Sequence, residues 1–556
     1  MTHRPVAADV YRDQVLRQVP RALGMLDRDA FSRTSGCMDR THWAWKFTDF
    51  PGARFQEGLC VLGFLYATPL EGAHYFRNPR LLRWIDAGFR FWMQIQRRGG
   101  DFDEAYPFEH SLAATAFTSF YLAEAWKLVG EDLPRATSER FVAALDRAGR
   151  WLLANDEAHG FLSNHLAAAA AALYHAYQIT GREELERRSR HFLEKILEHQ
   201  SPEGWYDEYG GADPGYQTHG SFYLARYHEL SGDRDLAASL DRSFEFLAHF
   251  VHPDRSIGGE YASRNTQTYY PAAFEMMAGR SGAAAWIARE MLPSIEPATA
   301  AGLASVDVYN FFPLLNNYVF AFRAAAQEGR VLAPPSGPSD EPGNVHFPGA
   351  GLLKVRRPRF DLFVGLAKCG VVKLFDRERR RLVFSSCGYV GRLESGGIVS
   401  NQWQTADREI EQSEGHVVVA GRFYQVSRPV MGPWRFLAFR SFNLTLGRLA
   451  AAAAWIKKLL VRVLIYRKRE IDLSISRRIE VFEDGIDLVD RIQGSAGEVL
   501  ETLVHGDAFT TIHMGSSRYF VPHELVAADA PAAFGDPLDV GRLRAGVVRE
   551  ARVRLE

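Results

Sequence analysis

Residues 160–173 read GFLSNHLAAAAAAL, and this stretch decides how the first half of the chain folds. Alanine has the highest helix propensity of all residues, so the run from Ala167 to Ala172 predicts a helix. Asn164 and His165 stand at its start, just after the turn at Gly160. Unpaired backbone N–H groups make such a helix end positive. Asn164 is therefore either an N-cap or a side chain that faces a ligand.

The helical pattern extends over most of the first 330 residues. HSLAATAFTSFYLAEAWKLVG and LAAAAAALYHAYQITG carry apolar residues at helical spacing and end in glycine. REELERRSRHFLEKILEHQ alternates an apolar stripe with a charged face. We therefore predict an all-α domain over residues 1–330.

A weak internal repeat divides this domain. Its copies are GGDFDEAY, EAHGFLSNH, EGWYDEYGG and SIGGEYAS, which start at residues 99, 157, 203 and 256. Each joins a glycine turn to aromatic and polar residues, and a spacing of about 45 to 60 residues is that of one helical hairpin. Hairpins stacked in a ring would gather these turns at one end. We expect a polar and aromatic cleft there.

The second half of the chain has a different pattern. Residues 331–351 include LAPPSGPSDEPGNVHFPGAG, whose composition is typical of a linker. Short β-branched and alternating runs follow, such as GVVKLFD, HVVVAGRFYQV and SISRRIEVFEDGIDLVDRI. They predict an antiparallel β-sandwich over residues 352–556, with EDGI as a hairpin turn.

The overall composition excludes several classes of protein. The net charge of -1 gives no general attraction to nucleic acid. The four cysteines form no CxxC pair, which favours a reduced intracellular setting over a disulfide scaffold. The N-terminal MTHRPVAADVYRDQVLRQV lacks the apolar core of a secretory signal, so we expect a cytoplasmic protein.

A second polar stretch, GGADPGYQTHG, occupies residues 210–220. Its glycines let the backbone approach a ligand closely, and we expect Tyr216 and His219 to stand in a loop there. Taken alone, Tyr216 is equally consistent with an ordinary tyrosine at a packing interface.

With these residues in place, the sequence resembles the heparinase II/III-like and alginate-lyase-like polysaccharide lyases, in which an (α/α) toroid precedes an antiparallel β-sandwich. The resemblance rests on Asn164 and His165 at the start of an inner helix, on Tyr216 after a glycine-rich loop, and on the order of the two domains. It implies that Asn164 contacts a uronate carboxylate, and that Tyr216 and His165 transfer protons.

The chemistry of such an enzyme requires these residue types. Removing the C5 proton of a uronic acid places negative charge on the adjacent carboxyl group, so the site must stabilise an enolate-like carboxylate. Asn164 at a helix N-terminus meets that need as a hydrogen-bond donor. Tyr216 or His165 serves as the base, and Tyr216 then protonates the leaving glycosidic oxygen.

Other residues are expected to shape the substrate cleft. The aromatic and cationic side chains of CMDRTHWAWKF suit an acidic sugar, although the tryptophans are as well explained by packing between helices. YASRNTQTYYPAAFE supplies a second group, of which Arg264 is the best candidate for another carboxylate contact. The predicted substrate-binding residues are Arg40, Trp43, Trp45, His219, Arg264, Asn265 and Tyr269.

Two further sets of polar residues have a structural explanation as well as a functional one. The carboxylates Asp101, Asp103, Glu104 and Glu109 either support hydrolysis or cap helices. The lyases resembled usually add a histidine from the β domain, but His346, His416 and His505 stand isolated and are expected to be structural. The spacing of His, Asp and Glu in the β half gives no metal pattern, so we predict no metal and no cofactor.

A basic amphipathic insertion is predicted within the β domain, around residues 430–469. From Gly415 to Arg469 the sequence holds no acidic residue, while cations alternate with WRFLAF and LAAAAAWIKKLLVRVLIY. The apolar stretches are too short and too often interrupted to span a bilayer. We expect an interfacial segment facing anionic lipid, or alternatively a wall facing a polyanionic substrate or the helical domain.

The sequence thus predicts a polysaccharide lyase that cleaves a uronic-acid polymer by C5 proton abstraction and β-elimination. Two alternatives stay open. A uronate C5-epimerase shares the first step and reprotonates the opposite face, and a non-catalytic assembly factor would act at the membrane in polysaccharide synthesis. The expected partners are an acidic polysaccharide and, peripherally, the inner face of an anionic membrane, but not nucleic acid.

Overall fold

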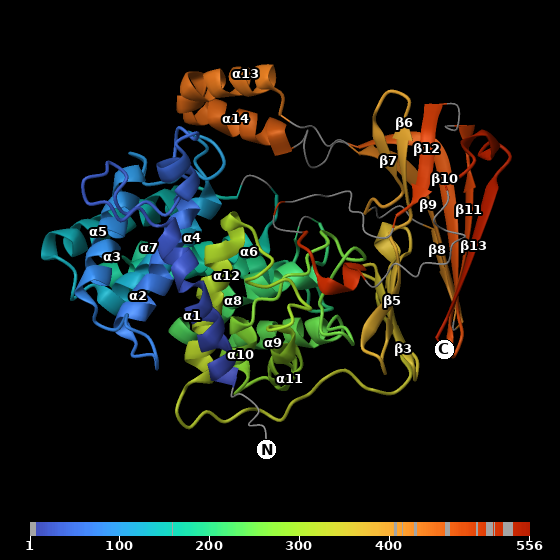
Figure 1. Cartoon of the computed structure of the whole chain (residues 1–556), viewed down its shortest axis with the longest axis horizontal. Helices are drawn as coiled ribbons and strands as arrows, with labels where there is room; N and C mark the ends of the chain where they lie inside the picture. Colours follow the sequence, from blue (N-terminus) through green and yellow to red (C-terminus); the bar gives the residue numbers. More distant parts are fainter. Residues whose placement is uncertain are drawn as a thin grey trace.

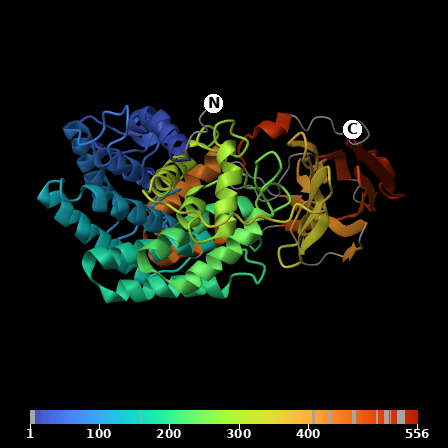
Figure 2. The ribbon, with the colours of Figure 1, turned by 90° about the horizontal axis from the view of Figure 1, so that it is seen from below.

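The computed structural model describes residues 7–157, 160–208, 210–404, 409–413, 415–426, 431–461, 468–495, 499–506, 515, 518–525 and 537–555. Helices make up the part up to Ala325, and two sheets make up most of the remainder. Figures 1 and 2 show the helices on one side of the molecule and the sheets on the other. The predicted order, a helical toroid followed by an antiparallel β-sandwich, is confirmed.

The helical part consists of helix pairs joined by short turns. Among the described residues its α-helices are α1 (Ala7–Met25), α2 (Leu59–Ala67), α3 (Pro79–Ile95), α4 (Leu112–Val129), α5 (Arg135–Ala154), α6 (Ser163–Thr180), α7 (Glu183–Glu198), α8 (Pro214–Ser231), α9 (Arg234–Ala248), α10 (Ala272–Met277), α11 (Gly282–Met291) and α12 (Val308–Ala325). The even-numbered helices α2 to α12 contact one another in sequence, and α12 returns to α2 and closes an inner ring. The odd-numbered helices α3 to α11 pack outside that ring.

Helix α6 shows why the inner ring forms. All six alanines from Ala167 to Ala172 are at most 1% exposed, because α4, α7 and α8 surround the helix. Small side chains let these neighbours approach on every side, whereas a helix of the outer ring needs only one apolar stripe. Helix α7 is such a case, since it buries Leu185, Phe192 and Ile196 and turns its charges outward.

The glycine turns of the repeat meet at one end of the ring. Leu162, after the second turn, forms an isolated antiparallel bridge with Glu208, after the third. The backbone N–H of Ser263, after the fourth turn, donates to the carbonyl of Ala212 at 2.9 Å. Segments that are about 50 residues apart in sequence therefore lie side by side, as the repeat predicted.

The β part contains two antiparallel sheets. The first has the strand order β1 (Gly343–Phe347), β2 (Leu352–Arg356), β3 (Phe360–Gly365), β4 (Val371–Asp376) and β5 (Arg381–Ser386). The second has the order β12 (Leu500–His505), β6 (Tyr389–Leu393), β7 (Ile398–Ser400), β9 (His416–Val426), β10 (Lys468–Val481), β11 (Gly485–Gln493) and β13 (Val547–Arg554), with β8 (Glu409–Gln412) also paired to β9. The predicted turn EDGI joins β10 to β11, where Val481 pairs with Ile486.

The central strands β3 and β4 of the first sheet are buried on both faces. Leu362 and Val364 of β3 belong to the core shared with the second sheet, whereas Phe363 belongs to the core of the helical part. Successive strand residues point to opposite faces, so one strand packs against both layers. The two domains therefore share an apolar interface.

The predicted basic insertion forms a helical hairpin of α13 (Pro433–Leu444), the short 3₁₀ turn η5 (Leu446–Arg448) and α14 (Ala450–Val461). It packs against the helical part. The Arg440 guanidinium lies 3.1 Å from the Asp49 carboxylate, and the rings of Phe439 and Tyr106 meet edge to face with centroids 5.0 Å apart. The cations Arg428, Arg462 and Arg467 of this run lie outside the described residues.

A buried ion pair connects neighbouring strands of the β-sandwich. Arg477 and Asp490, on neighbouring strands, form two hydrogen bonds of 2.7 Å and are both fully buried. Asp490 also accepts from Tyr389 at 2.9 Å, and Arg477 donates to the carbonyl of Gly370 at 3.0 Å. The pair thereby links β10 and β11 to β6 and to the turn before β4.

We predict that Arg477→Met lowers the free energy of unfolding by about 3–5 kcal/mol, because Asp490 is left buried without its counter-ion. Replacing both partners, as Arg477→Met with Asp490→Leu, should cost clearly less. Urea unfolding measures both, and Arg478→Met, a half-exposed arginine on the same strand, is the matched control. Equal losses for Arg477→Met and Arg478→Met would contradict the assignment.

Candidate active site

Asn164 is the second residue of α6 and is not its N-cap. Leu162 occupies the cap position, without a capping side chain. The Asn164 side-chain amide instead donates to both carboxylate oxygens of Glu208 at 2.9 Å, and its backbone N–H donates to Glu208 Oε1 at 3.0 Å. The capping alternative is therefore wrong. The amide is engaged by a second buried residue of the same chain.

Glu208 is the centre of this arrangement, although the sequence did not single it out. Its carboxylate is almost fully buried and lies 3.6 Å from the guanidinium of Arg264. Burial raises the pKa of Glu208 to about 7, against the opposing effects of Arg264 and of the hydrogen bonds from Asn164. The carboxyl group is thus poised to exchange a proton near neutral pH.

Tyr216 lies next to Arg264. The guanidinium carbon of Arg264 is 4.0 Å from the centre of the Tyr216 ring, and the tyrosine is 9% exposed. The expectation that Tyr216 and His219 stand in a loop is wrong, because both lie in the first turns of α8. Pro214 at the first helical position and the Asp213 carboxylate, which accepts from the Tyr216 N–H at 3.1 Å, start the helix before them.

His219 lies one turn after Tyr216, with the two rings at right angles and 5.7 Å apart. It stacks on Tyr270 at 4.2 Å, and its Nε2 is hydrogen-bonded to the Tyr223 hydroxyl at 3.1 Å. Burial is the main cause that lowers the pKa of His219 well below its ordinary value, and the nearby Arg54, His165 and Arg264 add to it. His219 is therefore a neutral imidazole at physiological pH.

His165 has a carboxylate partner of its own. Its Nδ1 lies 2.6 Å from Glu157 Oε2, and its ring meets Phe117 edge to face at 5.6 Å. A carboxylate at one imidazole nitrogen fixes the tautomer and leaves the other nitrogen to accept a proton. His165 remains 17% exposed. It is the accessible histidine of the group, and His219 is the buried one.

A cavity of about 790 Å³ borders the pair of His165 and Glu157, and Glu157 forms part of its wall. Its walls come from the first glycine turn, from the end of α5 and from the insertion. They include Arg97, Arg98, Phe108, His110, Trp151, Glu157, Arg448 and Ala453. A cavity of this size, with aromatic and cationic walls, is within the range of ligand pockets.

A second arginine near the site, Arg54, comes shortly before α2 in the chain. Arg54 pairs with Glu57 at 2.7 Å and with Glu104 at 3.3 Å, and it stacks over Phe117 at 4.6 Å. Burial raises the pKa of Glu57 to about 7, while Arg54 acts against that rise. Arg54 and Glu57 were missed because Glu104, which pairs with Arg54, lies about 50 residues further along the chain.

The β domain also contributes to the site. The hydroxyl of Tyr519 accepts from Asn310 at 2.8 Å and donates to Asp307 at 3.3 Å. Burial, Asp307 and the neighbouring Tyr216 raise the pKa of Tyr519. The side chain of Gln404 donates to the carbonyl of Gly210 at 3.0 Å, beside the segment that holds Glu208. The candidate site therefore lies where the end of the toroid meets the sandwich.

Residues 80–305 match the model of the family described as the ulvan lyase N-terminal domain. This range includes α6, α8, Glu208, Tyr216 and Arg264. The site residues Arg54, Glu57, Asp307 and Asn310 and those of the β domain lie outside it. The chain has a polysaccharide lyase fold. No curated protein matches its sequence significantly.

Solved structures of such lyases superpose on nearly the whole chain. Chondroitin AC lyase from Streptomyces coelicolor A3 is 13% identical, with 90% of this chain and 68% of that chain covered and a TM-score of 0.55. Xanthan lyase from Paenibacillus is 11% identical, with 89% of this chain and 46% of that chain covered and a TM-score of 0.54. The chain thus spans less than half the length of the xanthan lyase. Heparinase III superposes with a TM-score of only 0.48.

Three predicted residues lie apart from Glu208 and Tyr216. Arg40 donates to the carbonyl of Gly24, and the Trp43 indole donates to that of Met25, so both are tied to the end of α1. Trp45 is 67% exposed at the end of the short π-helix η1 (Thr41–Trp45). The structure gathers the three on one surface segment but does not bring them to the carboxylate of Glu208.

The other predicted residues divide between site and core. Asn265 follows Arg264 with a left-handed backbone (φ 63°) and is 1% exposed. Tyr269 stacks on Phe274 at 5.7 Å, and burial followed by the nearby Glu275 raises its pKa. Tyr269 is therefore part of the core near α10 and not of the cleft.

The carboxylates of the first glycine turn shape their own loop. Asp103 accepts from the backbone of Phe108 and His110 and pairs with Arg97, while Glu109 accepts from the backbone of Glu104 and Ala105. The helix-capping explanation is wrong, because these bonds close a loop before α4. They fix the wall of the cavity beside His165.

The histidines considered in the β domain are remote from the site. His346 is exposed, His416 bonds to Ser413, and His505 bonds to Ser386 at 2.7 Å. Among the described residues of the β domain, His523 reaches the helical part, where its Nδ1 lies 3.1 Å from Asp254. The segment SRYFVPHEL, which holds Tyr519 and His523, gave no periodic or motif signal that could have identified it.

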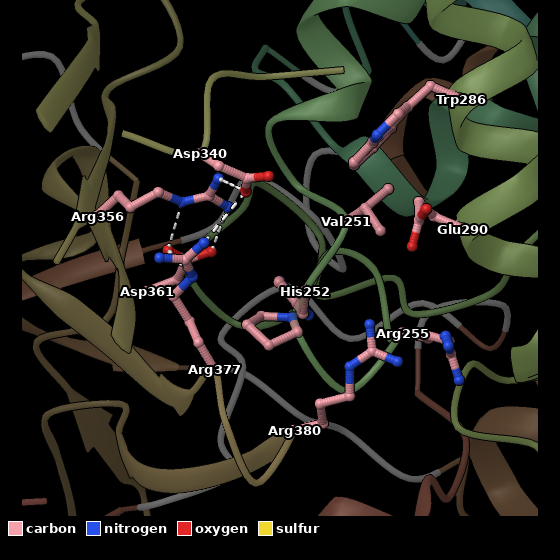
Figure 3. Close-up of a pocket in the computed structure, with 11 residues that line it drawn as sticks. Val251, His252, Arg255, Trp286, Glu290, Asp340, Arg356, Asp361, Arg377 and Arg380 are labelled. Atoms are coloured by element: carbon pink, nitrogen blue, oxygen red, sulfur yellow. Dashed lines mark hydrogen bonds and ion pairs between the residues drawn. The ribbon is translucent and has the colours of Figure 1, made fainter. Parts of the chain in front are cut away.

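A smaller cavity of about 170 Å³ lies between α11 and the first sheet, away from Glu208 and Tyr216 (Figure 3). Arg356 pairs with Asp340 at 2.8 Å and with Asp361 at 2.7 Å, and Arg377 pairs with Asp340 at 3.1 Å. Figure 3 shows these ion pairs on one wall, with Trp286 and Glu290 across from them. The cavity is part of the contact between the domains.

The described part of the chain holds no group of three or more His, Cys, Asp or Glu side chains placed to bind one metal ion. All four cysteines are buried and unpaired with one another. Every helix in the described ranges is too short or too polar to cross a bilayer.

The raised pKa of Glu208 makes a prediction about stability. Its folded pKa of about 7 exceeds the ordinary value of 4.5, so the protonated form stabilises the fold and this contribution is lost as the pH rises through 7. Relative to Glu208→Gln, the wild type should lose on the order of 3 kcal/mol of stability between about pH 5 and about pH 8. Glu194→Gln, an exposed glutamate of α7, is the control. A pH-independent difference between wild type and Glu208→Gln would show that Glu208 titrates normally.

Proposed function

We propose that the chain is a polysaccharide lyase that cleaves a uronic-acid polymer by removing the C5 proton and eliminating the 4-linked sugar. The observation that carries this proposal is that Arg264 lies between the buried Glu208 and the ring of Tyr216, while His165, next to Asn164 at the start of α6, is paired with Glu157. The family match and the fold likeness support the same reaction class. The heparinase II/III-like subtype is part of the proposal.

Arg264 is proposed to neutralise the substrate carboxylate. Loss of the C5 proton moves negative charge onto that carboxylate, so a fixed cation beside it stabilises the transition state more than the ground state. Glu208 and the ring of Tyr216 hold the guanidinium in place, and Asn164 in turn holds Glu208. In this proposal Asn164 acts on the substrate carboxylate indirectly, because it holds Glu208, which holds Arg264. The resemblance implied a direct contact between Asn164 and that carboxylate.

His165 and Tyr216 are proposed to move the two protons. His165, oriented by Glu157, takes the C5 proton, and the electron pair forms the C4–C5 double bond as the C4–O bond breaks. Tyr216 gives its hydroxyl proton to the leaving glycosidic oxygen. Arg264, which lies on the ring of Tyr216, stabilises the phenolate that remains until solvent restores the proton.

The cavity beside His165 is proposed to hold neighbouring sugars of an acidic polysaccharide. Trp151 and Phe108 supply apolar faces for sugar rings, and Arg98 and Arg448 supply positive charge for acidic groups. We place the protein in the cytoplasm, with peripheral contact to the inner face of the membrane. No nucleic acid and no cofactor take part in the proposed reaction.

Tyr216→Phe is expected to lower turnover by about 10²–10⁴-fold, because only the proton-transferring hydroxyl is lost. His165→Gln should have a loss of similar size. Thermal melting should stay within a few degrees of wild type for Tyr216→Phe. Tyr177→Phe, at the far end of α6, is the matched control and should keep full activity. Full activity of Tyr216→Phe would remove it from the mechanism.

The reaction type is tested by incubating the protein with a panel of uronate polymers in deuterated water. A lyase forms a double bond conjugated to the carboxyl group, and therefore a near-ultraviolet absorbance, with shorter chains. A C5-epimerase would instead incorporate deuterium at C5 without shortening the chain. Absence of both signals with every polymer would favour the non-catalytic alternative.

A further inference from the structure

The hairpin of α13, η5 and α14 interrupts the connection between β9 and β10 and is not part of the sheet. Strands β9 and β10 are antiparallel neighbours, and Val426 pairs directly with Lys468. A tight turn could join two strands at that point. The chain instead leaves the sheet and places two helices against the toroid, away from the strands to which they are joined (Figure 1). The hairpin therefore has a role other than completing the β-sandwich.

One face of α13 is fixed to the toroid. Asn443 is 1% exposed, Phe439 packs edge to face on Tyr106, and Arg440 pairs with Asp49. These three residues lie within one turn of each other on the helix. They orient the helix, so its opposite face has a defined direction.

The opposite face is apolar and exposed. Trp434, Leu437 and Leu444 recur at helical spacing and are 82%, 56% and 42% exposed. The stripe continues through Leu446 and Leu449 of the connecting turn, and through Trp455 and Leu459 of α14. A helix packed by one polar and aromatic face would normally turn charge to solvent on the other. A contiguous exposed apolar surface of this kind marks an interaction site.

The positive charge around this apolar stripe indicates which kind of partner it binds. Residues 415–469 contain eleven Lys and Arg and no Asp or Glu, and Arg435 and Lys458 are exposed on the hairpin itself. Exposed Trp and Leu flanked by cations are typical of helices that lie in the interface of an anionic bilayer. We propose that the outer face of the α13–α14 hairpin, defined by the seven apolar residues above, docks the protein on an anionic lipid surface. This inference rests on the proposed place of action and not on the proposed reaction.

The same hairpin forms one wall of the cavity beside His165. Arg448 lies over the ring of Phe108 at 5.4 Å, and Arg448 and Ala453 line the cavity from above. Docking the outer face on lipid therefore brings the cavity next to the membrane surface. A polysaccharide chain attached to a lipid would reach the cleft from that surface.

The test is co-sedimentation of the full chain with vesicles of phosphatidylcholine alone or mixed with phosphatidylglycerol, at low and high salt. We expect binding to the anionic vesicles only, weakened by salt because exposed charges are screened. Arg435→Glu with Lys458→Glu should reduce binding about tenfold or more. Trp434→Ser with Leu437→Ser should reduce it to a similar degree. Phe31→Ser, at a site 99% exposed elsewhere, and Arg83→Glu with Arg491→Glu are the matched controls and should bind like wild type.

Equal partitioning of wild type and hairpin variants, or equal binding to neutral vesicles, would overturn the proposal. So would a vesicle-free dimer that Trp434→Ser with Leu437→Ser breaks, because the stripe would then cover a second copy. Turnover of a soluble uronate polymer is measured in the same preparations. Vesicle binding without turnover would sink the proposed reaction alone, and turnover without vesicle binding would sink the docking surface alone.

Discussion

The burial of most of each inner helix is the constraint on which the rest of the molecule depends. Along most of its length a helix such as α6 or α8 has neighbours on every side, so its buried polar side chains must find their partners inside the protein. Tyr121, Tyr223 and His219 therefore join in a chain of hydrogen bonds across the ring. Only at the helix ends, where the glycine turns meet, can polar groups face a substrate.

Glu208 shows how that constraint shapes the site. Its carboxylate costs free energy to bury, and the cost is reduced by two hydrogen bonds from Asn164 and by the nearby Arg264. The result is a carboxyl group with a pKa of about 7 that fixes a cation on the ring of Tyr216. Stability and the proposed chemistry thus rest on the same group.

The two domains depend on each other at this end of the toroid. The first sheet gives one face to the helical core and the other to the second sheet, so the sandwich cannot move away without exposing both. In this position it delivers Tyr519 to the neighbourhood of Tyr216 and His523 to Asp254. Lys373 of β4, paired with Glu260 at 2.7 Å, lies beside His523 and adds a buried ionic contact. The site is therefore a property of the interface.

The sequence by itself determined the order of the domains, the helical repeat, the gathering of its turns and the placement of Asn164 and His165 at the start of a helix. These follow from periodicity, turn residues and helix starts, which are local properties. Only the tertiary structure decided that Asn164 holds Glu208, that Glu157 holds His165, that Tyr269 is core, and that Tyr519 and His523 reach the helical part. Asn164 and Glu208 are 44 residues apart, and Asp254 and His523 are 269 apart. A single sequence has no local signal for such pairings, because they arise when whole elements pack and buried charges must find partners.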